Sequence, residues 1–170
     1  MKRLSIILTL LLLCGTAFCQ QLSVQKISED LASSRVSFNF SFKVVDKGSR
    51  DVGGEALVQG QCFRVRAGSA LVISDSKTRW TVDANSKEIY IERGGKLPSI
   101  LTNPKQLAKS VSVSNSSADG ISGVFSNPED GLKYNFSISS FVSEPVQEEK
   151  SPFTFDVTGL DKSWIVTDLR

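Results

Sequence analysis

The side chains that most often carry catalysis and metal binding are scarce in this chain. Its 170 residues include no histidine and only three cysteines. The lack of histidine excludes Ser-His-Asp and Cys-His catalysis, histidine general bases and histidine-ligated zinc. Adjacent carboxylates occur at Glu129 and Asp130 and at Glu148 and Glu149. Both pairs stand beside glycine, proline or lysine, which is typical of solvated loops rather than of a glycosidase site. We therefore expect a protein that is not an enzyme and that uses no cofactor.

The first 19 residues have the pattern of a cleavable export signal. Lys2 and Arg3 form a positive start, and Leu4–Leu13 is a short apolar run. Ala17 and Cys19 then supply small residues at the −3 and −1 positions of a cut before residue 20. The apolar run is too short to span a bilayer. The sequence thus predicts an exported protein.

A lipid-anchored form is the alternative to a soluble exported one. Cys14 and Cys19 both follow apolar residues, as acylated cysteines do. Lipidation signals normally place a small residue just before the cysteine, whereas Leu13 and Phe18 stand there. The soluble form is therefore favoured.

Removal of residues 1–19 changes the charge and the cysteine count. Two of the 20 basic residues leave, so 18 basic residues face 18 acidic ones and the net charge becomes zero. A neutral chain has no general attraction for nucleic acid or for anionic membranes. Cys62 is then the one remaining cysteine, which excludes an internal disulfide. We expect residues 20–170 to form a single domain that binds no nucleic acid.

Alternation of apolar and polar residues predicts a mainly β protein. The segment 20–34 has a helical spacing of apolar residues, and 36–44 alternates strictly between apolar and polar side chains. Short apolar runs separated by polar or glycine-containing turns continue to Glu92, so 35–92 is predicted to be an antiparallel meander.

The pattern changes after Gly94 and Gly95. Apolar residues in 97–110 recur at three- and four-residue intervals, which predicts two short helical pieces split near 102–106. Pro104 suits a first helical turn, with Asn103 as its N-cap. Further strands are expected at 111–114, 120–125, 132–142, 153–159 and 163–170.

These elements predict one large curved antiparallel sheet with a single apolar face. Two short helical segments are available to cover that face. Strong curvature would let the sheet close partway around the helices and leave a hollow, although the pattern does not distinguish a hollow from a filled core.

The segment "GGEALVQGQCFRVRAGSALVISDSKTRWTVDANSKEIYIE" resembles the exported lipoprotein carriers of the LolA family. The family has a G-x-L strand, an F-R strand, V-I-S-D-G-K-T-x-W-x-Y-D and a K-x-V strand. The matching residues are Gly54, Leu57, Phe63, Arg64, Val72, Ile73, Ser74, Asp75, Lys77, Thr78, Trp80 and Asp83. The ending Asp168-Leu169-Arg170 is similar to the family's last strand.

The resemblance implies an open half-barrel of antiparallel strands closed by helical lids (a LolA-like fold). It implies a periplasmic monomer whose concave face holds the acyl chains of lipoproteins in transit from the inner to the outer membrane. Its partners would be an inner-membrane lipoprotein exporter and an outer-membrane acceptor. An envelope module that senses lipid and regulates a partner is the alternative with the same fold.

Two departures from the family pattern affect these expectations. Ser76 occupies the usual turn glycine. The better-studied carriers have a basic residue and a proline before the F-R strand, where the arginine tethers the lid, and Gln59–Gln61 stands there instead. No tethering arginine is therefore assigned.

The candidate residues follow from the apolar positions of the predicted strands and helices. The candidates for the cavity wall are Phe38, Phe40, Phe42, Leu57, Phe63, Val65, Trp80, Ile89, Ile91, Phe136 and Ile138. The candidates for the lid are Leu22, Ile27, Leu31, Ile100, Leu101 and Leu107. The alternative for the wall residues is an ordinary filled sheet core, and the alternative for the lid residues, over which the lid is favoured, is an ordinary covering helix.

Overall fold

A computed structural model describes residues 21–45, 51–95, 104–128, 131–149 and 151–170. The predicted export signal, the first helical piece at 97–102 and the Asn103 cap lie outside the described residues.

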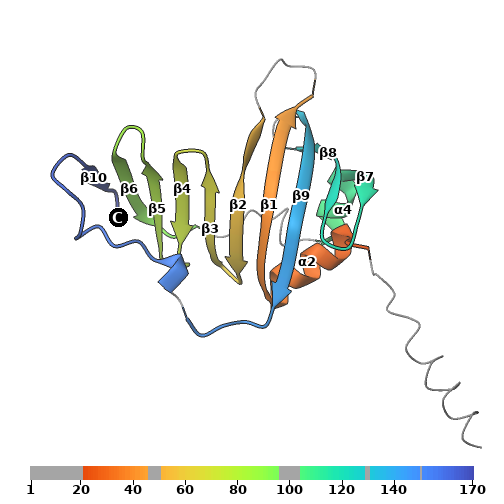
Figure 1. Cartoon of the computed structure of the whole chain (residues 1–170), viewed down its shortest axis with the longest axis horizontal. Helices are drawn as coiled ribbons and strands as arrows, with labels where there is room; N and C mark the ends of the chain where they lie inside the picture. The colour runs from red at the N-terminus through yellow and green to blue at the C-terminus, as the bar shows by residue number, and fades with distance from the viewer. Residues whose placement is uncertain (1–20, 46–50, 96–103, 129–130, 150) are drawn as a thin grey trace, which may run out of the picture.

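Strands dominate the described part of the chain, and two short helices accompany them (Figure 1). The elements are α2 (Val24–Ser33), β1 (Arg35–Val44), β2 (Val52–Gln59), β3 (Cys62–Ala67), β4 (Ala70–Ser74), β5 (Thr78–Asp83), β6 (Glu88–Arg93), α4 (Pro104–Ser110), β7 (Val111–Ser116), β8 (Ile121–Ser126), β9 (Lys133–Glu144), the 3-10 turn η1 (Ser151–Phe153) and β10 (Ile165–Asp168).

The strands form one open sheet in the order β10-β6-β5-β4-β3-β2-β1-β9-β8-β7. Consecutive strands from β1 to β6 and from β7 to β9 pair as antiparallel neighbours, as predicted. The prediction of a wholly antiparallel sheet is wrong for β10, which pairs in parallel with β6. The chain reaches β10 by a long crossing from β9 instead of a hairpin, and such a connection allows a parallel pair.

Both described helices lead directly into strands. The Ser23 hydroxyl caps α2 by accepting the Lys26 backbone N–H at 3.1 Å, and one residue separates α2 from β1. Helix α4 begins at Pro104, the predicted first-turn position, and β7 follows it without a gap. Neither helix is long and apolar enough to cross a membrane.

The expected single apolar face is wrong, because the sheet carries a buried core on each face. Directly paired residues of neighbouring strands share a face. Phe38 pairs with Ala56, Ala56 with Val65, Val65 with Val72 and Val72 with Thr81, so this face turns from apolar to polar after β4. We call it the helix-side face, since α2 packs on its apolar half.

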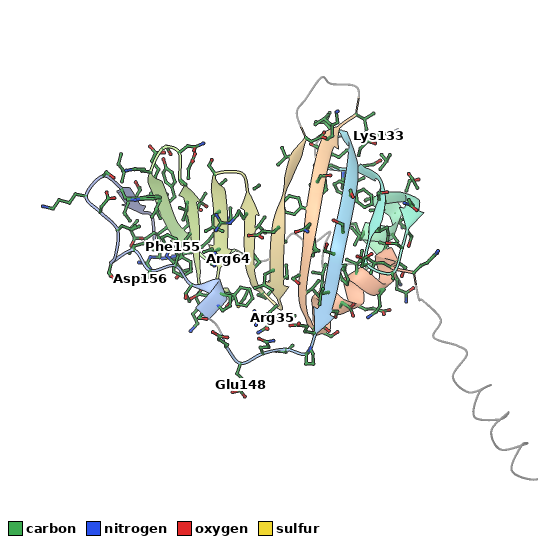
Figure 2. All side chains as sticks on the ribbon, in the orientation of Figure 1. Arg35, Arg64, Lys133, Glu148, Phe155 and Asp156 are labelled. Atoms are coloured by element: carbon green, nitrogen blue, oxygen red, sulfur yellow. The ribbon has the colours of Figure 1, made fainter. Side chains whose placement is uncertain are left out.

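The second core lies on the opposite, strap-side face of β4, β5 and β6. It consists of Leu71, Ile73, Val82, Ile89 and Ile91. The segment 151–164, which we call the strap, covers it with Phe155, Val157, Leu160 and Trp164. Figure 2 shows Phe155 and Asp156 in front of this half of the sheet.

The strand predicted at 153–159 is wrong, because this stretch is the turn η1 followed by irregular chain. Its alternating residues do bury apolar side chains, but the backbone is held locally. The Asp156 carboxylate accepts the backbone N–H of Thr158 at 2.8 Å and its hydroxyl at 2.7 Å. Such a side-chain turn competes with strand pairing.

A bulge in β9 brings one more aromatic residue to the helix-side face. Ser37 pairs with Val142 and Asn39 with Ser139, so Ser140 and Phe141 together oppose a single residue of β1. Ser140 has a φ of 53°, and Phe141 packs in the helix-side core.

Asp75 holds the turn between β4 and β5, as predicted. Its Oδ1 atom accepts the backbone N–H groups of Lys77 at 2.8 Å and Thr78 at 2.7 Å. Ser76 has a φ of 77°, which is the left-handed conformation that a glycine adopts without strain.

We expect Ser76→Gly to raise the free energy of unfolding by about 0.5–1 kcal/mol, because relief of the left-handed strain exceeds the added flexibility of the unfolded chain. Ala84→Gly, in the exposed β5–β6 turn without a positive φ, is the control and should lower stability slightly. Urea unfolding measures both. A loss of stability in Ser76→Gly would contradict the expectation.

The strap-side core should be as important for stability as the helix-side core. Ile89 is 0% exposed, whereas Ile165 on the edge strand β10 is 60% exposed. We expect Ile89→Ala to cost about 2–5 kcal/mol and Ile165→Ala to cost less than about 0.5 kcal/mol. Equal effects of the two substitutions in urea unfolding would show that the strap does not seal a core.

Candidate functional site

An apolar cavity lies between the helices and the helix-side face of the sheet. Its volume is about 410 Å³, within the range of roughly 300–1,000 Å³ found for small-molecule sites. Among the residues that the structure describes, fifteen line the cavity and all are apolar: Val24, Ile27, Leu31, Phe38, Phe40, Phe42, Ala56, Val58, Val65, Leu107, Val111, Ile121, Phe125, Phe136 and Ile138.

Strand β1 supplies three aromatic rings to the cavity wall, because its alternate residues share a face. Phe40 and Phe42 lie with ring centroids 5.6 Å apart, and Phe38 stacks on Phe141 at 6.2 Å. Phe136 and Ile138 of β9 pair with Phe42 and Phe40 respectively, so they continue the same wall.

The cover over the wall comes from two helices on separate parts of the chain. Ile27 and Leu31 of α2 and Leu107 of α4 line the cavity. Leu22, two residues before α2, is fixed to the end of β7 and the connection that follows it: the Leu22 N–H donates to the Ser117 carbonyl at 2.6 Å, and the Ser116 hydroxyl donates to the Leu22 carbonyl at 2.5 Å. These contacts hold the start of α2 against the sheet.

The lining can bind but offers no group for a reaction. None of the described lining side chains titrates or donates a hydrogen bond. Within the described segments, no group of three or more Cys, Asp or Glu side chains is placed to hold a metal ion. A wall of this kind selects ligands by apolar surface and shape.

The carboxyl groups with lowered pKa values belong to exposed turns and to the chain end. Hydrogen bonds from Thr158 lower the pKa of Asp156, and hydrogen bonds from Ser163 lower that of Asp161. The Arg170 side chain, by its hydrogen bond, holds the pKa of Asp168 at about 2. The hydrogen bonds that lower these pKa values stabilise local turns. None of these described carboxyl groups lines the cavity.

The cavity brings together most of the predicted wall and cover residues. Six predicted wall residues line it: Phe38, Phe40, Phe42, Val65, Phe136 and Ile138. Three predicted lid residues line it too: Ile27, Leu31 and Leu107. Phe63 and Leu22 pack in the helix-side core beside the cavity. Ile100 and Leu101 lie outside the described residues.

Four predicted wall residues are on the wrong face. Trp80, Ile89 and Ile91 belong to the strap-side core, and Leu57 lines a hollow on the strap-side face. For Trp80, Ile89 and Ile91 the cause is register: Ile73, which pairs with Trp80, is itself paired with Arg64 of β3 and not with Phe63 or Val65. A one-residue change of parity moves every side chain to the other face.

Six lining residues were not predicted. They are Val24, Ala56, Val58, Val111, Ile121 and Phe125. On β2 the cavity is lined by Ala56 and Val58, the alternating pair on either side of the larger Leu57. Ile121 and Phe125 also alternate within their strand, a signal that could have identified them.

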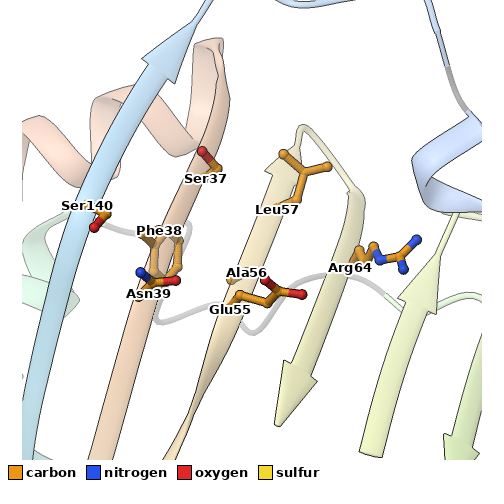
Figure 3. A pocket seen from close by; sticks show the side chains of 8 residues that line it. All are labelled: Ser37, Phe38, Asn39, Glu55, Ala56, Leu57, Arg64 and Ser140. Atoms are coloured by element: carbon orange, nitrogen blue, oxygen red, sulfur yellow. The ribbon is translucent and has the colours of Figure 1, made fainter.

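A second hollow of about 430 Å³ lies on the strap-side face of β9, β1, β2 and β3 (Figure 3). Its lining is mixed: Ser37, Asn39, Glu55, Arg64 and Ser140 are polar or charged, and Phe38, Ala56 and Leu57 are apolar. Glu55 contacts Arg66 at 3.3 Å, and Figure 3 shows the Arg64 guanidinium pointing away from Glu55.

No protein-family model matches the sequence, and no curated protein matches it.

Neighbouring residues on opposite faces give a direct test of the cavity. Ala56 is buried on the cavity wall, and Leu57 points to the other face. We expect Ala56→Phe to fill part of the cavity and to weaken binding of the uncharged dye N-phenyl-1-naphthylamine by about tenfold, which corresponds to ~1.4 kcal/mol. Leu57→Phe should leave it nearly unchanged. Fluorescence titration measures both, and equal weakening would place the dye elsewhere.

Proposed function

We propose that this protein is a periplasmic carrier that binds the acyl chains of lipoproteins and moves them from the inner to the outer membrane. The observation that carries the proposal is the cavity beneath α2 and α4, whose described lining is wholly apolar. The export-type leader and the sequence resemblance to the LolA family, which extends over most of the mature chain, support the same function.

The physical need for such a carrier follows from the free energy of transfer. Each acyl CH₂ group moved from water into an apolar site gains ~0.8 kcal/mol, so a lipid with several chains does not cross water unaided. A carrier has to bind the chains firmly and still release them. Many apolar contacts together bind the chains firmly, although no single contact is strong.

The cover is built in a way that suits release. Helix α4 has seven residues, a length at which a helix is marginal without tertiary contacts. Helix α2 is held at its start by the two hydrogen bonds of Leu22. Opening of α4 would therefore expose the cavity at low cost, whereas α2 is held more firmly because it buries Ile27 and Leu31 in the helix-side core. We propose that α2 and α4 act as the lids of a LolA-like half-barrel in a monomer that receives cargo from an exporter and passes it to an acceptor.

The alternative function with the same fold is a lipid-sensing module that regulates a partner, and one contact separates this chain from the better-studied carriers. Gln59 stands in the stretch where the family's lid-tethering arginine is found. Its amide instead makes reciprocal hydrogen bonds with the backbone of Gln147, at 2.8 and 3.1 Å. Gln147 lies between β9 and the strap, so this contact ties the β2 end to the strap-side segment and not to a lid. Gating then differs from that of the better-studied carriers.

Native mass spectrometry of the protein purified from the periplasm should detect bound lipid or lipoprotein, and the protein should release a lipoprotein from inner-membrane vesicles into solution. Phe40→Gln, on the cavity wall, should weaken binding of a palmitoylated peptide by about tenfold. Phe155→Gln is the matched control, because Phe155 is also half-buried but belongs to the strap and packs against the strap-side core. Its binding should match the unaltered protein.

Three results would contradict the proposal or redirect it. A protein that is lipid-free from the periplasm and releases no lipoprotein would contradict the carrier function. Equal loss of binding in both variants would place the ligand outside the cavity. Lipid binding without any release from vesicles would favour the sensing module.

A further inference from the structure

The helix-side face is divided into an apolar half and a polar half that are continuous with each other. One row of directly paired residues runs from Ala56 through Val65, Val72 and Thr81 to Tyr90. The first two line the cavity, and the last two carry hydroxyl groups. Neighbouring strands lie about 4.8 Å apart, so the row extends ~19 Å from the cavity wall to Tyr90.

The polar half is accessible to a ligand. Tyr90 is 40% exposed, and Thr81 is half-buried. The core of these three strands is on the other face beneath the strap, so the polar residues of this half are not needed to pack a core. We call Thr81, Asp83, Glu88 and Tyr90 the polar strip.

The charge of the polar strip is negative. Asp83 and Glu88 are directly paired across β5 and β6, although like charges opposite each other are unfavourable. Neither forms an ion pair with any residue in the described ranges. The neighbouring Arg79 does not compensate, because it already pairs with Glu92 at 2.5 Å.

Hydrogen bonds keep both carboxylates in place as acceptors. Asp83 accepts the Asn85 backbone N–H at 2.9 Å, which lowers the pKa of Asp83. Glu88 accepts the Tyr90 hydroxyl at 3.2 Å and the Ser86 hydroxyl at 3.3 Å, and its charge raises the pKa of Tyr90. The lowered pKa of Asp83 keeps this carboxylate negative at neutral pH.

We propose that the ligand is an amphiphile whose acyl tail lies in the cavity and whose polar, not negatively charged, head group lies on the polar strip. This inference rests on the proposed function and specifies its substrate class. The hydroxyl groups of Thr81 and Tyr90 suit a head group rich in amides or hydroxyls. The two carboxylates select against an anionic head group by repulsion, since specificity is a difference between affinities.

Two palmitoylated peptides that differ only in head-group charge test this inference. N-palmitoyl tetrapeptide amides of sequence GTSG (neutral) and GEEG (anionic) share one tail and one length. Isothermal titration calorimetry at low salt should show about tenfold tighter binding of the neutral peptide, because surface repulsion is weakly screened there. The double variant Asp83→Asn, Glu88→Gln should reduce this ratio to about twofold or less.

The control variants separate the polar strip from the cavity. Phe40→Gln should weaken both peptides by a similar factor and preserve their ratio. Thr81→Val should weaken the neutral peptide more than the anionic one. Circular dichroism and urea midpoints show that each variant is folded.

Failure of this inference is distinguishable from failure of the proposed function. If both peptides bind equally to the unaltered protein and Phe40→Gln weakens both, the head-group site is overturned and the acyl-binding cavity stands. A ratio that persists in the double variant also overturns the assignment to Asp83 and Glu88. If neither peptide binds, the proposed function and this inference both fail.

Discussion

The architecture depends on the two-residue period of its strands and on the register that locks each strand to the next. Direct pairing keeps Phe38, Ala56 and Val65 on one face, and the same pairing turns Ile73, Trp80 and Val82 to the other. The sheet therefore needs two covers: α2 and α4 over one half and the strap over the other half of the opposite face. Because the core of β4, β5 and β6 lies on the strap-side face, the helix-side face does not have to form one continuous packed core. The cavity lies on this helix-side face.

Local patterns predicted most strands but not the side on which their apolar residues lie. The alternation of Phe38, Phe40 and Phe42 predicts both β1 and its buried face, and Asp75 predicts its turn. The face of Ile89 depends on four successive registers between β2 and β6, which the sequence of β6 does not contain. The parallel pairing of β10 likewise depends on a long connection whose path is decided by tertiary contacts.

The candidate site was predictable to the same degree as the fold. Helical spacing identifies Ile27 and Leu31, and strand alternation identifies Phe136 and Ile138. That a space remains between them is a matter of volume, since apolar residues of the same pattern fill most cores without a gap. Ala56 contributes by being small, and a search for large apolar residues overlooks a small one. The volume of the hollow follows from three-dimensional packing and not from the periodicity.

The bulge in β9 makes the exact length of this strand important for the packing of Phe141. Ser140 and Phe141 occupy the space of one residue, and the positive φ of Ser140 lets Phe141 stack on Phe38. Deletion of one residue here would restore flat pairing, but Phe141 would no longer have the extra residue that places it against Phe38. Substitutions in this part of β9 are therefore more readily accommodated than changes in its length.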